Sequence, residues 1–379
     1  MSHAVIAGYA RSPFTFAQKG ALRSVRPDDL AATVVRGLVQ RLGLPPDTIE
    51  DLILGCAFPE AEQGFNLARL VGLAAGLPQS VGGVTVNRFC GSSMEAIHIA
   101  AGRVALGAGD AFLCAGVESM SRVPMTGFNP MPNPRLAAEI PGAYMPMGET
   151  AENVARKWQI SRAAQEEFAL ASQQKAAAAQ AAGHFTAEIV PIPARSGEVA
   201  QDGCIRPETT RETLAGLKLA FDQAGSVTAG TSSPLTDGAA AVLVCSEAYA
   251  ARHGLTPLAR IAAVAVAGCA PELMGIGPVA ASRKALARAG ITIADIGVVE
   301  LNEAFASQSL ACIRDLSLAP DTVNLDGGAI ALGHPLGATG ARITGKAAAL
   351  LARQGARYAL ATQCIGGGQG IATILERAQ

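Results

Sequence analysis

Cys90 lies where a thiol has reason to be reactive. In VTVNRFCGSSMEAIHIAA, residues 84–101, a short β-branched run precedes it and a helical pattern follows it. Ser92 and Glu95 match a capping box, which predicts a helix starting within two residues of Cys90. The free N–H groups and positive end of such a helix would favour a thiolate and lower the pKa of Cys90. From the spacing alone, a packed and unreactive cysteine is an equally good interpretation of Cys90.

A thiolate nucleophile usually works with a base, and His334 is the strongest candidate among five histidines. His3 is near the terminus, His98 falls inside the helix predicted after Cys90, and His184 and His253 look like helix C-terminal residues. His334 differs because GGAIALGHPLGATGARI places it in a glycine-rich loop between an apolar run and a helix. We therefore favour a functional His334 over a histidine that only packs its loop.

Cys364 and Asn302 are further candidates that follow strand-like runs. Three glycines follow Cys364 in ATQCIGGGQGIA, so the backbone can approach a ligand and its N–H groups can bind an oxyanion. A tight turn with a buried thiol is the alternative. Asn302, with Glu303 in VVELNEAFAS, could orient a water or polarise a carbonyl. From the residues alone, a helix cap is the favoured interpretation of Asn302.

The elements that must position these residues read as an α/β protein. The chain has 379 residues, half of them hydrophobic and 16% charged, which predicts a large core and about two or three packed domains. A net charge of −1 gives no reason to expect nucleic acid or an acidic membrane surface as a partner. No signal peptide, membrane-spanning run or peroxisomal address is recognised, so we expect a cytoplasmic protein. Its eight scattered cysteines are then expected to be free thiols.

The order of elements divides the chain. Strand and helix patterns alternate over 1–119, give way to a Pro-, Met- and Gly-rich segment with one helical stretch over 120–232, and then return. The C-terminal part repeats the order of the N-terminal part, with strand, loop, helix and strand around both Cys90 and His334. Two similar layered halves would bring these two loops to one shared face.

Five motifs make the chain resemble the thiolase family over essentially its whole length. They are VNRFCGSSMEAI (86–97), GTSSPLTDGAAA (230–241), LNEAFA (301–306), GGAIALGHPLGATGAR (327–342) and QCIGGGQG (363–370). The resemblance implies a thiolase fold, with two βαβαβαββ halves in a five-layer αβαβα sandwich and an inserted loop domain that binds coenzyme A. We predict that 1–119 and 233–255 form the first half, 120–232 the loop domain and 256–379 the second half.

The resemblance also implies a role for each candidate. Cys90 would be the acylated nucleophile, His334 would take its proton and Cys364 would be the second acid/base. Asn302 would hold a water that helps to form one oxyanion hole. The backbone N–H groups of Cys90 and Gly366 would form the other. Coenzyme A and acyl-CoA would be substrates, and neither a metal nor a cofactor is expected.

For coenzyme A, the resemblance assigns Arg206 to the nucleotide end, Ser233 to the pantetheine and Met147 to the channel near the reacting end. A solvated surface arginine is the alternative for Arg206. Short-chain biosynthetic members often carry a histidine where this chain has Pro146. The chain is more similar to degradative bacterial 3-ketoacyl-CoA thiolases, which act in fatty acid β-oxidation. We expect a homodimer or homotetramer, with a hydratase–dehydrogenase subunit as a further partner.

Three alternatives follow. An acetoacetyl-CoA-forming acetyltransferase would use the same residues in the biosynthetic direction. Decarboxylating ketoacyl synthases share the fold but need a second catalytic histidine where this chain has Cys364. A non-catalytic coenzyme A-binding relative would be expected to lack Cys90, His334 or Cys364, and all three are present.

Overall fold

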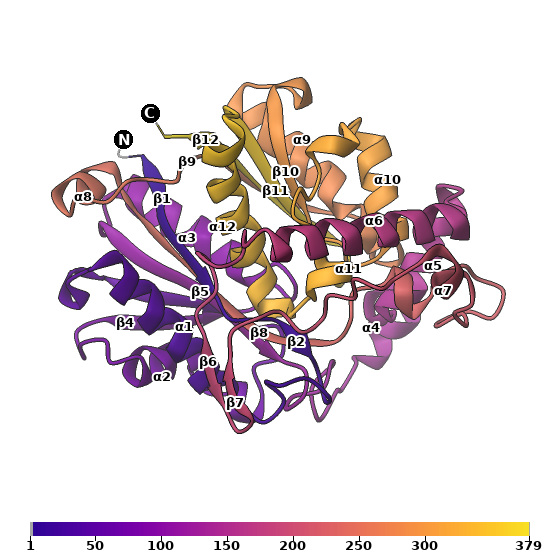
Figure 1. Ribbon diagram of the computed structural model, residues 1–379, viewed down its shortest axis with the longest axis horizontal. Helices are drawn as coiled ribbons and strands as arrows, with labels where there is room; N and C mark the ends of the chain where they lie inside the picture. The colour runs from indigo at the N-terminus through magenta and orange to yellow at the C-terminus, as the bar shows by residue number, and fades with distance from the viewer. Residues whose placement is uncertain (1–2, 379) are drawn as a thin grey trace.

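A computed structural model describes residues 3–378, and its main feature is a ten-stranded sheet. One half contributes β1 (Ala4–Arg11), β8 (Thr236–Ser246), β5 (Ala111–Ser119), β3 (Asp51–Gly55) and β4 (Gly82–Val86), in that spatial order. The other contributes β9 (Ala259–Gly268), β12 (Gln369–Arg377), β11 (Tyr358–Ile365) and β10 (Ile296–Leu301). The short β2 (Thr15–Phe16) pairs with β8. The halves meet through two residue pairs between β1 and β9 (Figure 1).

The two halves repeat one strand order. β1, β8, β5 and β3 are matched by β9, β12, β11 and β10. Val323 forms a parallel bridge to Val299 on β10, in the place that β4 takes beside β3. The internal repeat expected from the sequence is therefore confirmed.

Helices fill the space between the halves and cover their outer faces. α3 (Ser92–Leu106) packs against α12 (Leu336–Gln354) in the middle layer, and α12 touches strands of both halves. α1 (Pro27–Leu42) and α2 (Leu67–Ala74) cover the N-terminal half, and α9 (Gly277–Ala289) and α10 (Ala306–Leu316) share a core with the C-terminal strands. The fold is therefore the predicted five-layer thiolase sandwich.

The strand sequences explain these layers. On β5, Leu113 and Ala115 point into the core shared with α1, whereas Phe112 and Cys114 point into the core shared with α3 and α12. Successive side chains on a strand face opposite sides, so a strand buried on both faces carries an unbroken apolar run. Small residues let the middle helices approach closely: a Cβ on Gly340 of α12 would lie 2.3 Å from the backbone N of Met94 on α3.

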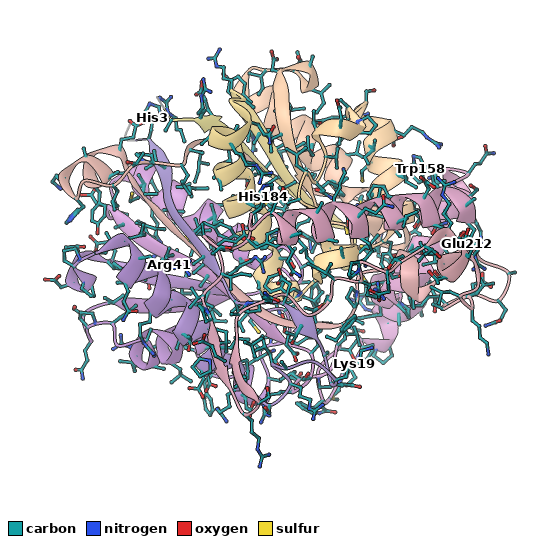
Figure 2. All side chains as sticks on the ribbon, in the orientation of Figure 1. His3, Lys19, Arg41, Trp158, His184 and Glu212 are labelled. Atoms are coloured by element: carbon teal, nitrogen blue, oxygen red, sulfur yellow. The ribbon has the colours of Figure 1, made fainter. Side chains whose placement is uncertain are left out.

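The segment between β5 and β8 carries most of the remaining elements. They are α4 (Pro134–Glu139), α5 (Met147–Lys157), α6 (Arg162–Ala181), the hairpin of β6 (Ile192–Ala194) and β7 (Gly197–Val199), and α7 (Arg211–Ala215). α6 lies across the C-terminal half and packs on α10 and on α11 (Ala329–Leu332) (Figure 1). Trp158 and His184 lie near opposite ends of α6 (Figure 2). The indole N–H of Trp158 donates to Asp315 of α10 at 3.0 Å. α8 (Glu247–Arg252) follows β8.

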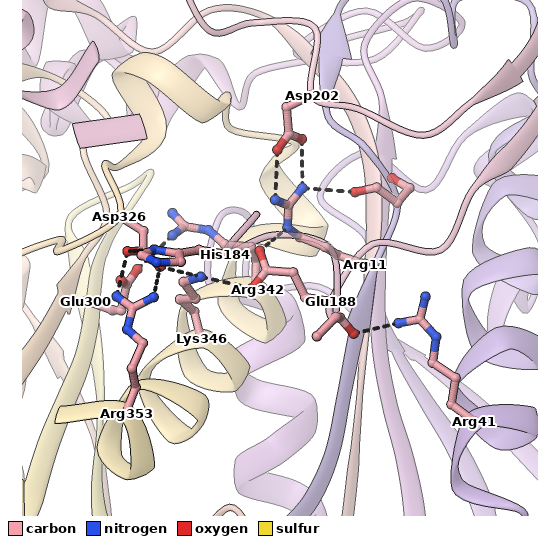
Figure 3. Close-up of polar contacts among 12 residues, drawn as sticks. Arg11, Arg41, His184, Glu188, Asp202, Glu300, Asp326, Arg342, Lys346 and Arg353 are labelled. Atoms are coloured by element: carbon pink, nitrogen blue, oxygen red, sulfur yellow. Dashed lines mark hydrogen bonds and ion pairs between the residues drawn. The ribbon is translucent and has the colours of Figure 1, made fainter. Parts of the chain in front are cut away.

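A buried ion network fastens this segment to the sandwich (Figure 3). The fully buried Arg11 of β1 donates to Glu188 at 2.7 Å and to both oxygens of Asp202 at 2.7 and 2.8 Å. Lys346 of α12 pairs with Glu188 at 3.0 Å and with Asp326 at 2.7 Å. These contacts fix the connecting segment relative to β1 and α12. Among the described helices, none has both the length and the apolar character to cross a membrane.

Candidate active site

Cys90 sits on a sharp turn between β4 and α3. Phe89 just before it has a φ of +43°, a left-handed conformation that costs energy for a bulky residue. Asn87 holds this turn: its side-chain oxygen accepts the N–H of Phe89 at 2.8 Å, and its amide donates to the carbonyl of Ala57 at 3.0 Å. Cys90 is 9% exposed, and α3 starts at Ser92 as predicted. The elbow therefore presents the thiol from a fixed backbone.

The predicted capping box is wrong. Gly91 occupies the N-cap of α3, and no side chain caps the helix. Ser92 instead accepts the N–H of Arg88 at 2.9 Å and donates to the carbonyl of Phe89 at 2.6 Å. Glu95 forms an ion pair with Arg88 at 2.9 Å. The Ser92 hydroxyl therefore stabilises the elbow rather than the helix end, because the N–H of Arg88 and the carbonyl of Phe89 in the turn are its partners.

The expected low pKa of Cys90 is also wrong. Burial raises the pKa of the Cys90 thiol to about 11, although the N–H groups of Gly366 and of Cys90 itself lower it in part. Here the free-energy cost of removing a thiolate from water exceeds the stabilisation that the two N–H groups and the start of α3 give to it. Cys90 therefore rests as a thiol and needs a base to become a nucleophile.

His334 lies in the tight loop between α11 and α12. Gly333 has a φ of +103°, and a Cβ there would lie 2.7 Å from Thr236, so this turn requires glycine. The backbone N–H of His334 donates to the Thr236 hydroxyl at 3.0 Å. Its Nδ1 lies 2.7 Å from Oγ1 of Thr339, which donates in turn to the carbonyl of Pro335 at 3.2 Å. Nδ1 therefore carries the proton, and Nε2 keeps its lone pair.

Burial lowers the pKa of His334 to about 3, so the imidazole is neutral at ordinary pH. A neutral imidazole whose Nε2 carries no proton is able to accept one. Nε2 of His334 lies 3.4 Å from the side-chain amide of Asn302. The ring is therefore neutral and available to accept the proton of Cys90, although the same burial weakens it as a base.

Asn302 lies just past β10, and its N–H donates to the carbonyl of Thr362 on β11 at 3.0 Å. α10 begins at Ala306 with Phe305 at the N-cap position, so the favoured interpretation of Asn302 as a helix cap is wrong. Its side-chain oxygen is buried and has no hydrogen-bond partner among the described residues. A buried acceptor of this kind is where a water or a ligand is expected to bind.

Cys364 is 1% exposed near the end of β11, and a glycine turn follows it. Gly367 and Gly368 have φ values of +79° and +85°, which explains part of the glycine run. Gly366 directs its N–H to the sulfur of Cys90. Burial raises the pKa of Cys364, and the nearby Cys90 thiol raises it further. The Cys90 thiol therefore lies close enough to Cys364 to affect the ionisation of Cys364.

The residues assigned to coenzyme A lie at different places. Met147 starts α5 and shares a small core with Cys364; its sulfur would lie 3.4 Å from a Cβ on Gly366. Ser233 donates its N–H and hydroxyl to the carbonyl of Ala304, at 3.0 and 3.1 Å, just past Asn302. Both therefore border the candidate site.

Arg206 has no contact with these residues. Its guanidinium lies 5.9 Å from the ring centre of Phe16 on β2, which pairs with Thr236 of β8. Its Nε is buried and has no partner among the described residues. A partly buried arginine stacked on a ring is not simply a solvated surface residue.

Three residues of the site are absent from the sequence-based prediction. Thr339 fixes the His334 tautomer, Gln363 donates to the carbonyl of Cys90, and Glu118 accepts the N–H of Gly337 near His334 at 2.9 Å. Glu118 has a visible signal, because it is a charged residue directly after the apolar run AFLCAGV. The roles of Thr339 and Gln363 depend on contacts that no local pattern reveals.

The arrangement suits covalent acyl transfer. The buried Cys90 thiol and the neutral His334 imidazole come from matching loops of the two halves, as the repeat predicted, and the buried Cys364 thiol lies near the end of β11 in the second half. The N–H of Gly366 lies at the Cys90 sulfur, beside the place where the oxygen of an attacked carbonyl would become an oxyanion. Backbone N–H donors of this kind stabilise such a charge without having to reorganise.

Comparisons with known proteins agree with this geometry. The family model "Thiolase, N-terminal domain" matches residues 4–248, and "Thiolase, C-terminal domain" matches residues 255–377. The chain is 51% identical to a 3-ketoacyl-CoA thiolase of Pseudoalteromonas translucida (strain TAC 125), with both chains fully covered. It is 47% identical to one of Bacillus subtilis (strain 168), covering 99% of this chain and 100% of the relative.

Solved structures show the same similarity. Human mitochondrial 3-ketoacyl-CoA thiolase superposes with a TM-score of 0.92 at 38% identity, covering 100% of this chain and 99% of the human chain. The human enzyme in complex with CoA gives a TM-score of 0.91 at 38% identity, covering 100% and 98% of the two chains. With both family models matched in order and full-length relatives at about half identity, the chain belongs to the thiolase family.

Proposed function

We propose that this enzyme is an acyltransferase that cleaves 3-ketoacyl-CoA in fatty acid β-oxidation, passing the shortened acyl group from Cys90 to coenzyme A and releasing acetyl-CoA. The observation that carries the proposal is the hydrogen bond from Gln363, beside Cys364, to the carbonyl of Cys90, which brings the end of β11 to the Cys90 elbow, with a neutral His334 on the matching loop. Full-length relatives named 3-ketoacyl-CoA thiolase support the choice of substrate class.

The first step is cleavage of the substrate. Nε2 of His334 takes the proton of Cys90, and the thiolate attacks the 3-keto carbon. The N–H groups of Cys90 and Gly366 stabilise the resulting oxyanion. When that oxyanion collapses, the C2–C3 bond breaks, and its electron pair becomes the enolate of acetyl-CoA. Removing one such donor typically costs about 10²–10³ in rate.

The enolate is then stabilised and protonated. A water accepted by the free side-chain oxygen of Asn302 donates its other proton to the enolate oxygen, beside the protonated Nε2 of His334. The Cys364 thiol protonates the enolate carbon, and acetyl-CoA leaves. The unpartnered oxygen of Asn302 and the raised pKa of Cys364 support these two roles.

The second half returns the enzyme to its starting state. The Cys364 thiolate takes the proton of coenzyme A, whose sulfur attacks the thioester on Cys90. The Cys90 sulfur leaves and recovers the proton held by His334. Coenzyme A and acyl-CoA are substrates in this scheme, and its steps use the chain's own side chains and backbone and the water on Asn302, with no resident metal or cofactor.

A chain-length series tests the substrate class. Thiolysis rates with 3-ketoacyl-CoA of increasing length are expected to exceed the rate with acetoacetyl-CoA. Pro146 favours this outcome, because short-chain biosynthetic relatives often carry a histidine there. A clear preference for acetoacetyl-CoA would instead assign the chain to the acetyl-CoA acetyltransferases.

Coenzyme A is proposed to contact Met147, Ser233 and Arg206 in order from its thiol to its nucleotide. Met147 lies against Gly366, Ser233 beside the Asn302 loop and Arg206 on Phe16, and the human relative has been solved with CoA. Arg206→Ala is expected to raise KM for coenzyme A with kcat unchanged, and an unchanged KM would remove Arg206 from the site.

A homodimer or homotetramer in the cytoplasm is proposed for the assembled enzyme. β4 is an edge strand whose residues are all partly or fully exposed, and Phe65, Leu70 and Leu73 beside it are exposed as well. Exposed edges and apolar side chains are usually covered. Light scattering should give two or four times the chain mass of 38.5 kDa, and a monomer would contradict the proposal. A hydratase–dehydrogenase subunit is proposed as a further partner, to be tested by co-purification.

A further inference from the structure

Glu118 is a buried carboxylate near the end of β5. Its side chain is 1% exposed, and none of the ion pairs among residues 3–378 includes it. One oxygen accepts the N–H groups of Ala57 at 2.8 Å and Gly337 at 2.9 Å. The other accepts from Phe58 at 3.2 Å and from the Gln63 amide at 2.8 Å. Four N–H donors, rather than a cation, compensate this charge.

The donor set requires an ionised carboxylate. A carboxylate only accepts hydrogen bonds, whereas a carboxylic acid or an amide would turn a donor toward N–H groups. Burial raises the pKa of Glu118, and hydrogen bonds from Ala57, Gly337, Gln63 and Phe58 oppose the rise. The Cys56 thiol, 3.7 Å away, is a further titratable group facing it.

On one side of Glu118, a chain of hydrogen bonds connects the carboxylate to the turn that carries Cys90. The carbonyl of Ala57 accepts the amide of Asn87, and Asn87 accepts the N–H of Phe89 in the left-handed turn before Cys90. Ala57 and Cys90 also belong to the same small core. Displacement of the 56–58 turn would therefore move the elbow.

On the other side, Glu118 contacts the start of the helix that follows His334. Gly337 lies in the first turn of α12, three residues after His334. A Cβ on Gly337 would lie 2.6 Å from the carbonyl of Val117 and 2.9 Å from Glu118, so the sequence keeps the helix start in close contact with β5. Leu336 packs in the same small core as Cys90. Glu118 is thus hydrogen-bonded to the segments that carry both catalytic loops.

We propose that Glu118 is a positioning residue that sets the Cys90 elbow and the His334 loop at their working separation across the two halves. The inference rests on the proposed thiolase mechanism and deepens it. Without the carboxylate, the 56–58 turn and the start of α12 would each lose their shared acceptor. The proton transfer from Cys90 to His334 depends on their separation, so turnover would fall while substrate binding persisted.

Glu118→Gln keeps the shape of the side chain but turns an NH₂ group toward two N–H donors. Its kcat for thiolysis is expected to fall about 10²-fold, with KM values within about threefold of wild type. Glu118 is also the charged side chain that raises the pKa of Cys90. Another titratable group near the Cys90 sulfur is the Cys364 thiol. The pH profile for alkylation of Cys90 by iodoacetamide is therefore expected to shift to lower pH in the same variant.

Glu152→Gln is the matched control. Glu152 of α5 is also 1% exposed, and it accepts the N–H groups of Ser226 and Val227 without contacting either catalytic loop. Loss of the Glu152 carboxylate should lower the midpoint of unfolding but leave the pH profile of Cys90 alkylation unchanged. Glu118→Asp, which retains the charge on a shorter side chain, should reduce kcat and keep the wild-type alkylation profile. It also replaces Glu118→Gln as the test of kcat if that variant does not fold.

The results separate this inference from the proposed function. A kcat for folded Glu118→Gln within threefold of wild type would overturn the inference, as would an unshifted alkylation profile. It would also be overturned if Glu118→Asp had a wild-type kcat, or if Glu152→Gln reproduced both the fall in kcat and the shift. A wild-type enzyme that cleaves no 3-ketoacyl-CoA would instead refute the function, because alkylation of Cys90 needs no substrate.

Discussion

His334 and Thr339 are joined by a 2.7 Å hydrogen bond that decides which imidazole nitrogen is free. Thr339 donates its own proton to the carbonyl of Pro335, so it accepts from Nδ1–H of His334. Nε2 is left as the proton acceptor, facing Asn302 at 3.4 Å. A residue on the first turn of α12 thereby sets the chemistry of the loop before it.

Thr339→Val is expected to reduce kcat by about 10²-fold, the lower end of a general base's contribution, with little change in KM. The imidazole would lose the acceptor that holds Nδ1–H, so the wrong tautomer would become populated. Thr344→Val is the control, because Thr344 of the same helix is buried and donates only to the carbonyl of Gly340. Equal kinetic losses in the two variants would show that helix packing, not the tautomer, is responsible.

The buried His334 and the partly buried His98 make stability depend on pH. Burial lowers the pKa of His98 and of His334 to about 3 each, below the unfolded value of about 6.5. The unfolded chain then binds more protons, so their contribution to stability is complete above about pH 6.5 and is lost as the pH falls toward 3. Each contributes a slope of up to about 1.4 kcal/mol per pH unit.

His98→Gln isolates one of these slopes without touching the site. His98 contacts Thr373 on β12 at 2.9 Å, and glutamine can keep that hydrogen bond. Urea unfolding between pH 7.5 and 5 should show a shallower loss of stability in the variant. A pH dependence identical to that of the parent would mean that the folded protein protonates His98 freely.

Arg11→Leu is expected to lower the free energy of unfolding by about 3–5 kcal/mol, because it leaves Asp202 and Glu188 with less compensation in the interior. Arg211→Leu breaks an exposed ion pair with Glu167 and should cost at most about 1 kcal/mol. Denaturant titration of the two variants measures the difference. Comparable small losses would mean that the network of Figure 3 admits water.

The sequence predicted the parts of this protein that depend on local pattern and repetition. The matching order of elements around Cys90 and His334 predicted that both loops lie at one face, and Leu336, two residues after His334, packs in the same small core as Cys90. The state of Cys90 was not predictable, because its pKa depends on burial by segments far away in the chain. The capping box failed for a related reason: Ser92 found backbone partners in a turn whose shape no spacing rule describes.

Trapping the acyl-enzyme tests the central claim most directly. Wild-type protein is incubated with a 3-ketoacyl-CoA in the absence of free coenzyme A, and the digested peptides are analysed by mass spectrometry. The proposed mechanism predicts a mass increase equal to the shortened acyl group on the peptide carrying Cys90, and none in Cys90→Ser. Cys114→Ser, altered at a buried thiol on β5 that contacts the carbonyl of Ala96 at 3.4 Å, should still be acylated. No adduct on the Cys90 peptide, or an adduct that persists in Cys90→Ser, would contradict the account.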